Sequence, residues 1–213
     1  MPPSAPPLVL YTDSSPNRYK ITIALAELDL PYQLRHVRID DGEHRDAGFL
    51  RLNPHGRIPV LVDQESGVTL FESAAILLYL ADKAGRLLPA SGKARWEVIT
   101  WLMFHAASVG PVLGQRVHFE IVEKGAQRAA THHARQLGEA ALAAMDARLA
   151  TCAWLGGDAY SIADIASFGW LHIAHIVGFD CSAWPYLDRW YRLVAARPAV
   201  RHGVTVPAPA TGA

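Results

Sequence analysis

The first part of the chain alternates short apolar runs with helical periodicity. The runs at 8–11 and 32–39 are predicted strands, the second because apolar and polar positions alternate along it. Between them, apolar residues recur from Ile21 to Leu28 at the i, i+3, i+4, i+7 spacing of one helix face, and Pro31 ends that helix. The pattern predicts a strand–helix–strand unit.

A second group of elements follows directly. A short irregular helix is expected at 49–52, and the runs 58–62 and 68–71, separated by a turn-rich segment, are typical of a hairpin. An apolar helix then begins at Glu72 or Ser73. The predicted order of elements is β-α-β-α-β-β-α.

Beyond this helix the pattern is helical throughout. A segment that contains Pro and Gly, at 85–92, is predicted to be a linker between an α/β domain over 1–84 and an all-helical domain over 93–203. The end of the chain, 206–213, is rich in Pro, Ala and Gly and is expected to be disordered. Helices of the second domain are expected at 94–123, 127–150, 161–177 and 185–196.

One helix start in this second domain is well specified. Ser161 and Asp164 have the spacing of a capping box, in which a hydroxyl and a carboxylate satisfy the first backbone N–H groups of a helix. This role accounts for both residues, so a structural helix start is favoured over a catalytic Ser-Asp pair.

Composition restricts the function classes. The 213 residues are 51% hydrophobic and 19% charged, which is typical of a globular protein. The 20 basic and 20 acidic side chains cancel and form no block, so neither a nucleic acid nor an anionic membrane is an expected partner. The N-terminus lacks a leader pattern and no apolar run would span a bilayer. We expect a cytoplasmic protein.

Cysteine and histidine usage argues against two kinds of site. Cys152 and Cys181 form no disulfide framework, which agrees with a reducing compartment. His172 and His175 have helical i, i+3 spacing, but no cysteine or acidic ligand accompanies them. We therefore expect no metal site.

The stretch 53–82 contains two features that folding alone does not explain. Pro59 lies inside an apparent strand, which indicates an edge, a bulge or a cis bond because proline lacks the N–H of a ladder. Glu72 and Ser73 precede an apolar helix, where free backbone N–H groups and a hydroxyl favour a carboxylate ligand. The stretch is a candidate ligand site.

Three motifs together identify a family. RIPVLVD (57–63), ESAAI (72–76) and SIADIA (161–166) resemble, in this order, the cis-proline strand, the γ-glutamyl-binding helix start and the C-terminal cap of the cytosolic glutathione transferase superfamily. The resemblance extends over 8–200. It implies a thioredoxin-like N-terminal domain followed by an all-helical C-terminal domain, with glutathione as cosubstrate.

Two further segments resemble the bacterial nu class and its fungal relatives. SPNRYKI (15–21) is similar to the T-P-N-G-x-K-I turn of that group, and GPVLGQRVHF (110–119) to its G-P-M-L-G-Q-x-x-H-F stretch. The chain departs from the turn at two positions. Ser15 replaces Thr and keeps a hydroxyl, whereas Arg18 replaces Gly and adds bulk beside the expected position of the sulfur.

The resemblance implies that Ser15 and Asn17 are the catalytic residues that face the glutathione sulfur. A free thiol near pKa 8.5 is only slightly ionised at pH 7, and donors at a helix N-terminus favour the thiolate. The same residues would also serve as a simple turn and helix cap. Tyr11 and Ser14 remain rival activators, Tyr11 because some transferase classes use a tyrosine at the end of the first strand.

The remaining parts of glutathione also have implied partners. A cis bond at Pro59 would expose the backbone of Ile58 to the cysteinyl portion, Glu72 would bind the γ-glutamyl ammonium, and Ser73 its carboxylate. The structural alternative for Glu72 and Ser73 is an ordinary helix start.

Two other groups of residues have more general assignments. His44 and Arg57 lie where related classes place donors to the glycyl carboxylate, although His44 fits an exposed loop equally well. Tyr11, Arg116, His118 and Phe119 are candidates for the electrophile side.

Two reactions share such a site: addition of the thiolate to an electrophilic small molecule, and exchange with a small-molecule disulfide. The first turn holds no C-x-x-C pair, so disulfide chemistry must run through glutathione itself, and the nu-class resemblance favours it. The resemblance also implies a homodimer. The alternative from another class is a non-catalytic binding or regulatory protein with the same fold.

Overall fold

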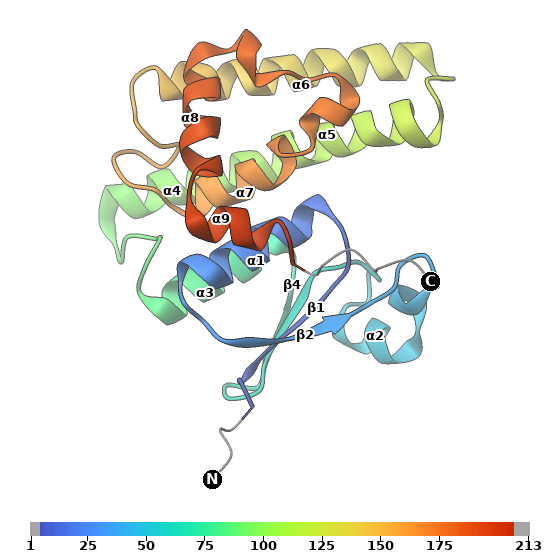
Figure 1. Ribbon diagram of the computed structural model, residues 1–213, viewed down its shortest axis with the longest axis vertical. Helices are drawn as coiled ribbons and strands as arrows, with labels where there is room; N and C mark the ends of the chain where they lie inside the picture. Colours follow the sequence, from blue (N-terminus) through green and yellow to red (C-terminus); the bar gives the residue numbers. More distant parts are fainter. Residues whose placement is uncertain (1–4, 207–213) are drawn as a thin grey trace. The chain divides into compact units, whose positions relative to one another are not determined.

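The structure of the protein is a computed structural model that describes residues 5–206. These residues form two compact units. The first unit contains the residues up to Ala84 together with those from Pro198 onward, and the second contains Gly85–Arg197 (Figure 1). The C-terminal segment 206–213 is expected to be disordered, and its residues from 207 onward lie outside the described part of the chain.

A four-stranded mixed sheet forms the first unit. Its order is β2-β1-β3-β4, with β1 and β2 parallel and the other two pairs antiparallel. β2 ends three residues before the predicted end at 39, because its pairing with β1 stops at His36 opposite Thr12. The strands are β1 Leu8–Thr12, β2 Tyr32–His36, β3 Val60–Asp63 and β4 Val68–Phe71.

Helices cover both faces of this sheet. α1 (Pro16–Glu27) and α3 (Ser73–Ala84) pack against each other on one face, and α2 (Ala47–Leu52), after a short 3₁₀ turn at Glu43–Arg45, lies on the other (Figure 1). The predicted βαβαββα order and the thioredoxin-like fold are confirmed. The cluster on the α2 face consists of Val37, Phe49, Ile58 and Val60, with Tyr11, Ile39, Leu52 and Val62 packed against it.

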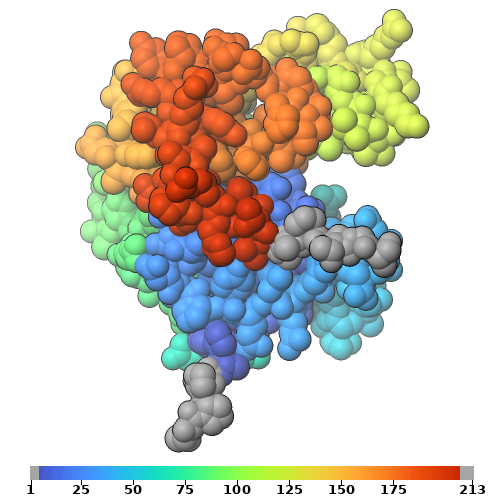
Figure 2. Space-filling view, in the orientation of Figure 1, coloured from blue at the N-terminus to red at the C-terminus, as the bar shows by residue number. Residues whose placement is uncertain are grey.

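The last helix, α9 (Pro198–Gly203), packs against α1, so its contacts lie in the first unit rather than in the helical domain that the sequence predicts over 93–203. The Thr22 hydroxyl donates to the Gly203 carbonyl at 2.7 Å. A Cβ on Gly203 would lie 2.7 Å from the Ile23 backbone nitrogen, so glycine permits the close approach. In Figure 2 the red α9 surface borders the blue surface of α1.

The second unit is helical. The predicted helix over 94–123 is one run of helical turns in which two π-helical turns, His105–Val109 and His118–Val122, interrupt the α-helical hydrogen bonding. The α-helices are α4 Gly92–Phe104, α5 Gly110–Val117, α6 Arg128–Leu149, α7 Ile162–Leu171 and α8 Pro185–Ala195, with 3₁₀ turns at Ala174–Val177 and Cys181–Ala183.

The predicted capping box is present at the start of α7. The Ala163 N–H donates to the Ser161 hydroxyl, and the Ser161 N–H donates to the Asp164 carboxylate at 2.9 Å. The buried carboxylate also accepts from the Leu155 N–H at 2.9 Å and the Trp190 indole at 2.8 Å. Burial raises the pKa of Asp164, while these hydrogen bonds act in the opposite direction. Asp164 therefore has the structural role.

Among the described residues, no helix has both the length and the apolar character that a membrane crossing requires.

The contact between α9 and α1 can be tested with Gly203→Ala. Because the added methyl group would meet the backbone of Ile23, we expect the free energy of unfolding to fall by about 1–3 kcal/mol. Urea denaturation followed by circular dichroism measures the change. Arg201→Ala, at an exposed position of the same helix, is the control and should shift stability by less than about 0.5 kcal/mol. Equal stability of the two variants would contradict the close packing.

Candidate active site

The register of the sheet brings three separate chain segments to one edge. Tyr11 of β1 pairs with Val60 of β3, and Val60 pairs with Phe71 of β4. β4 ends at this row, β1 ends one residue beyond it, and β3 begins at it, because β3 is antiparallel to both. The segment after β1, the segment before β3 and the segment after β4 therefore meet here. They contain Ser15 and Asn17, Ile58 and Pro59, and Glu72 and Ser73, respectively.

Ser15 is the N-cap of α1. It has extended backbone angles (φ −162°, ψ 157°), its hydroxyl oxygen accepts from the Arg18 N–H at 3.1 Å, and Pro16 occupies the first turn. A serine hydroxyl that accepts in this way retains its own O–H as a donor. The capping role and a contact to a sulfur anion are thus compatible in one residue. Ser14 is exposed, and its N–H donates to the Asp13 carboxylate.

Arg18 and Tyr11 both point into packed surroundings. The Arg18 side chain is 5% exposed, and its guanidinium donates to the Val204 carbonyl at 3.4 Å beyond α9. Tyr11 packs in the cluster with Phe49 on the α2 face, which is opposite to the face covered by α1. This is the packing role that the strand pattern also allows for Tyr11.

The peptide bond between Ile58 and Pro59 is cis, as the family resemblance implies. The strand ladder begins at Val60, so the Ile58 backbone lies outside the paired register. A residue that the sequence analysis missed, Asn53, is 2% exposed and its amide donates to the Arg57 carbonyl at 2.6 Å. Asn53 thereby holds the loop that leads into the cis bond.

His44 and Arg57 flank the same loop from two chain segments. His44 lies in the 3₁₀ turn, and its carbonyl oxygen would be 3.1 Å from a Cβ on Gly56, the residue before Arg57. Arg57 is exposed and His44 is half-buried. The structure thus brings the two residues expected at the glycyl end to adjacent positions.

Glu72 has a backbone conformation that residues other than glycine rarely adopt. Its φ is +70°, in the left-handed region, and its carbonyl accepts the Ile76 N–H at 3.0 Å, so Glu72 occupies the N-cap position of α3. Such a conformation costs about 1–3 kcal/mol in a residue other than glycine and is concentrated at functional sites. The glutamate is exposed and Ser73 begins the helix. No sequence pattern indicated this strain.

Lys20 is the second residue that sequence reasoning missed. It is 4% exposed, and its ammonium donates to the Asn17 amide oxygen at 2.8 Å and to the Ser73 hydroxyl at 3.2 Å. Burial lowers the pKa of Lys20 to about 7, while the charge of Glu72 acts in the opposite direction. The available signal was its position one turn before Ala24, on the predicted apolar face of the helix.

The other candidates for the electrophile side, Arg116, His118 and Phe119, lie in the second unit. The Arg116 guanidinium is buried, donates to the Thr131 and Val177 carbonyls at 3.1 and 2.9 Å, and pairs with Glu120 at 2.7 Å. Arg116 therefore connects α5 to α6 and to the 3₁₀ turn at 174–177.

His118 and Phe119 follow on the second π-helical turn, where their rings are in edge contact, with the ring centroids 5.4 Å apart and an interplanar angle of 70°. His118 is 3.6 Å from the Glu123 carboxylate. Both residues thus lie on an irregular helical segment whose geometry differs from the preceding α5.

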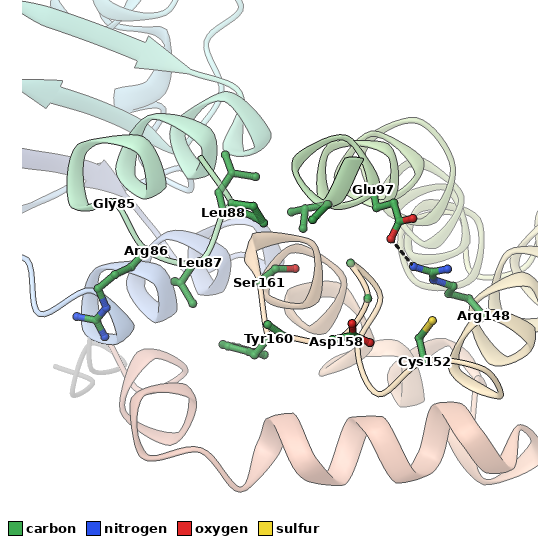
Figure 3. Close-up of a pocket in the computed structure, with 16 residues that line it drawn as sticks. Gly85, Arg86, Leu87, Leu88, Glu97, Arg148, Cys152, Asp158, Tyr160 and Ser161 are labelled. Carbon is green, nitrogen blue, oxygen red and sulfur yellow. Dashed lines mark hydrogen bonds and ion pairs between the residues drawn. The ribbon is translucent and has the colours of Figure 1, made fainter. Parts of the chain in front are cut away.

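A pocket of about 450 Å³ lies elsewhere in the second unit (Figure 3). Glu97 and Arg148 form an ion pair of 3.4 Å in its wall, and Arg148 also donates to the Leu155 carbonyl. Ser161 in the same wall belongs to the capping box. None of the residues predicted to bind a ligand lines this pocket, and Glu97, Arg148 and Ser161 in its wall have internal partners. No cluster of three metal-ligating side chains occurs among residues 5–206.

The ionisation of Lys20 makes stability depend on pH. The folded protein releases the Lys20 proton near pH 7 and the unfolded chain near 10.5, so the unfolded state binds one more proton within this window. The free energy of unfolding of the wild type should therefore rise with pH from about 7 to 10.5 relative to Lys20→Met. Urea denaturation across this range measures the difference. Lys93→Met, at a 90% exposed side chain, should follow the wild type throughout.

Comparison with known proteins agrees with this geometry. Residues 6–82 match the family model of the glutathione S-transferase N-terminal domain, and residues 100–198 match that of the C-terminal domain. The chain is 34% identical over 195 residues to the disulfide-bond oxidoreductase YfcG of Escherichia coli, covering 89% of this chain and 91% of that protein.

Solved structures are similar over nearly the whole chain. A glutathione transferase family member from Pseudomonas fluorescens with two glutathione bound has a TM-score of 0.88 and 33% identity, with 95% of each chain covered. A glutathione transferase from Pseudomonas putida with one glutathione disulfide bound per subunit has a TM-score of 0.89 and 31% identity, covering 97% of this chain and 94% of that one. This chain belongs to the glutathione S-transferase family, with both the N-terminal and the C-terminal domain of that family.

Proposed function

We propose that the chain is a glutathione-dependent enzyme that binds glutathione at the sheet edge of the first unit and ionises its thiol. The observation that carries this proposal is the convergence of three segments on one cross-strand row, each with groups that suit a different part of the peptide. The crystal structures with glutathione or its disulfide, which have chains similar to this one over 94% or more of its length, support the choice of ligand.

Each part of glutathione then has a partner. Ser15 and Asn17 donate to the sulfur at the N-terminus of α1, where the helix dipole also favours an anion. The Ile58 backbone beside Pro59 pairs with the cysteinyl portion. At the γ-glutamyl end, Glu72 binds the ammonium and Ser73 the carboxylate. The glycyl carboxylate is bound by His44 and Arg57.

The favoured reaction is reduction of a small-molecule disulfide. The first glutathione thiolate attacks one substrate sulfur, forms a mixed disulfide, and releases the other sulfur as a thiolate that takes up a proton. A second glutathione thiolate attacks the glutathione sulfur of the mixed disulfide. The products are glutathione disulfide and the second substrate thiol. The naming of YfcG as a disulfide-bond oxidoreductase supports this reaction over conjugation.

The cysteines of the chain are not needed for this chemistry. Cys152 and Cys181 both lie in the second unit, outside the first turn where a C-x-x-C pair would be. Burial raises the pKa of the Cys181 thiol to about 11, which makes it a poor nucleophile at neutral pH. Glutathione itself therefore supplies both reacting thiols.

Further features of the proposal rest on the family. His118 and Phe119 contribute to the electrophile side, with Arg116 holding the helix that precedes them.

The enzyme is a cytoplasmic homodimer, in which exposed apolar side chains such as Trp96 and Met103 of α4 offer surface for a second copy. Conjugation of the thiolate to electrophiles, as in detoxification, is the companion activity.

The reaction can be tested with purified protein. Reduction of hydroxyethyl disulfide by glutathione, followed through oxidation of NADPH by added glutathione reductase, should clearly exceed the uncatalysed rate. Conjugation to a chloronitrobenzene should be weak by comparison. The opposite profile would overturn the disulfide proposal and favour the conjugating enzyme. Absence of both activities, together with no glutathione binding by calorimetry, would leave the non-catalytic scaffold.

The sulfur-activating residue can be identified by two substitutions. Asn17→Ala should lower kcat/KM about 10- to 100-fold, because a hydrogen bond to a charged group contributes about 1.5–3 kcal/mol. Tyr11→Phe, which removes a hydroxyl from a side chain packed against α2, is the matched comparison and should have a far smaller effect. Steady-state kinetics at several pH values measures both. A larger loss in Tyr11→Phe would transfer the role to Tyr11.

A further inference from the structure

Lys20 lies between the two ends of the proposed glutathione site. Its ammonium, on a 4% exposed side chain, contacts Asn17 one turn earlier on α1 and Ser73 at the first residue of α3. The distances are 2.8 Å to the Asn17 amide oxygen and 3.2 Å to the Ser73 hydroxyl oxygen. Both partners are residues proposed to touch the ligand.

Because the lysine ammonium can only donate hydrogen bonds, it determines the orientation of the Asn17 carboxamide. An ammonium has three donors and no acceptor, whereas a carboxamide has an oxygen that accepts and an NH₂ group that donates. The oxygen must therefore face Lys20, and the NH₂ group is directed away from it. The reversed carboxamide would place donors against donors at the lysine and present oxygen lone pairs to a thiolate.

The same argument applies to Ser73. Its hydroxyl oxygen accepts from Lys20, so its single O–H hydrogen points elsewhere, as a donor. A donor is what a carboxylate ligand requires at the start of α3. One buried ammonium thus directs donors outward from both residues, toward the two negatively charged groups of glutathione in its thiolate form.

We infer that Lys20 is the positioning residue that directs the Asn17 amide and the Ser73 hydroxyl as donors toward the thiolate and the γ-glutamyl carboxylate. This inference rests on the proposed function, because both targets belong to bound glutathione. A hydrogen bond from an ammonium also polarises the carboxamide and makes its N–H groups better donors.

The cost of burying Lys20 agrees with a role beyond folding. Burial disfavours the ammonium, and Glu72 is the charged side chain that counteracts this effect. A lysine that is unfavourable in the core, and that connects two residues of a proposed site, has the character of a functional group. A bound thiolate and carboxylate would add further negative charge that favours the ammonium.

The test is the pKa of the glutathione thiol bound to the wild type and to Lys20→Met, measured by the ultraviolet absorbance of the thiolate across pH. Methionine keeps the length of the side chain and removes the donors. We expect the bound thiol pKa to rise by about one unit, a tenfold loss of ionisation, and the KM for glutathione to rise as well. Lys93→Met should leave both values unchanged.

A double-mutant cycle separates positioning from a general loss of packing. In an Asn17→Ala background, Lys20→Met should no longer shift the thiol pKa, because the carboxamide through which it acts is absent. In a Ser73→Ala background, the effect of Lys20→Met on the affinity for glutathione should become smaller for the same reason. Lys20→Gln, which retains a donor on an uncharged side chain, should shift the thiol pKa less than Lys20→Met does. Thermal unfolding verifies that each variant is folded.

Two outcomes would overturn the inference, and they differ from failure of the proposed function. If the wild type ionises bound glutathione and Lys20→Met does so at the same pH, Lys20 does not position the donors. If the effects of Lys20→Met and Asn17→Ala simply add, Lys20 does not act through Asn17. A wild type that neither binds glutathione nor supports turnover would instead reject the proposed function and this inference together.

Discussion

The candidate site depends on the antiparallel pairing of β3 with both β1 and β4. Pairing of Tyr11 with Val60, and of Val60 with Phe71, aligns the end of β1, the start of β3 and the end of β4 in one row. The connections at these points are far apart in sequence but adjacent in space. A shift of one residue in either pairing would turn the adjoining side chains to the opposite face and separate the three segments.

Around this row, the chain accepts local conformations and charges that folding alone does not favour. Glu72 has a positive φ, and Lys20 is buried with its ammonium between the first turns of α1 and α3. By contrast, Asp164 in the second unit is a buried carboxylate whose bonds to Ser161, Leu155 and Trp190 account for it fully. Both lysine and aspartate are buried, but the partners of Asp164 are structural elements, whereas those of Lys20 are proposed ligand contacts.

Much of the fold could be predicted from periodicity and turn residues, because those signals are local. The strand runs, the face of α1 and the capping box before α7 each depend on residues close in the chain. The prediction was weaker where distant segments decide the outcome. α9 packs against α1 through the Gly203 and Ile23 contact, and no local pattern specifies which helix receives it. The two π-helical turns within 94–123 were likewise not predicted from the sequence.

By itself, the sequence determined the element order, the family and the chemical types of the candidate groups, because motif spacing and residue identity are properties of the chain. Tertiary structure decided how those groups are turned and which neighbours they meet. Only the packing of α1 against α3 brings Lys20 to Ser73, 53 positions away, while it also contacts Asn17. The direction of a hydrogen bond depends on the donor placed opposite an acceptor, and that placement exists only once the helices are packed.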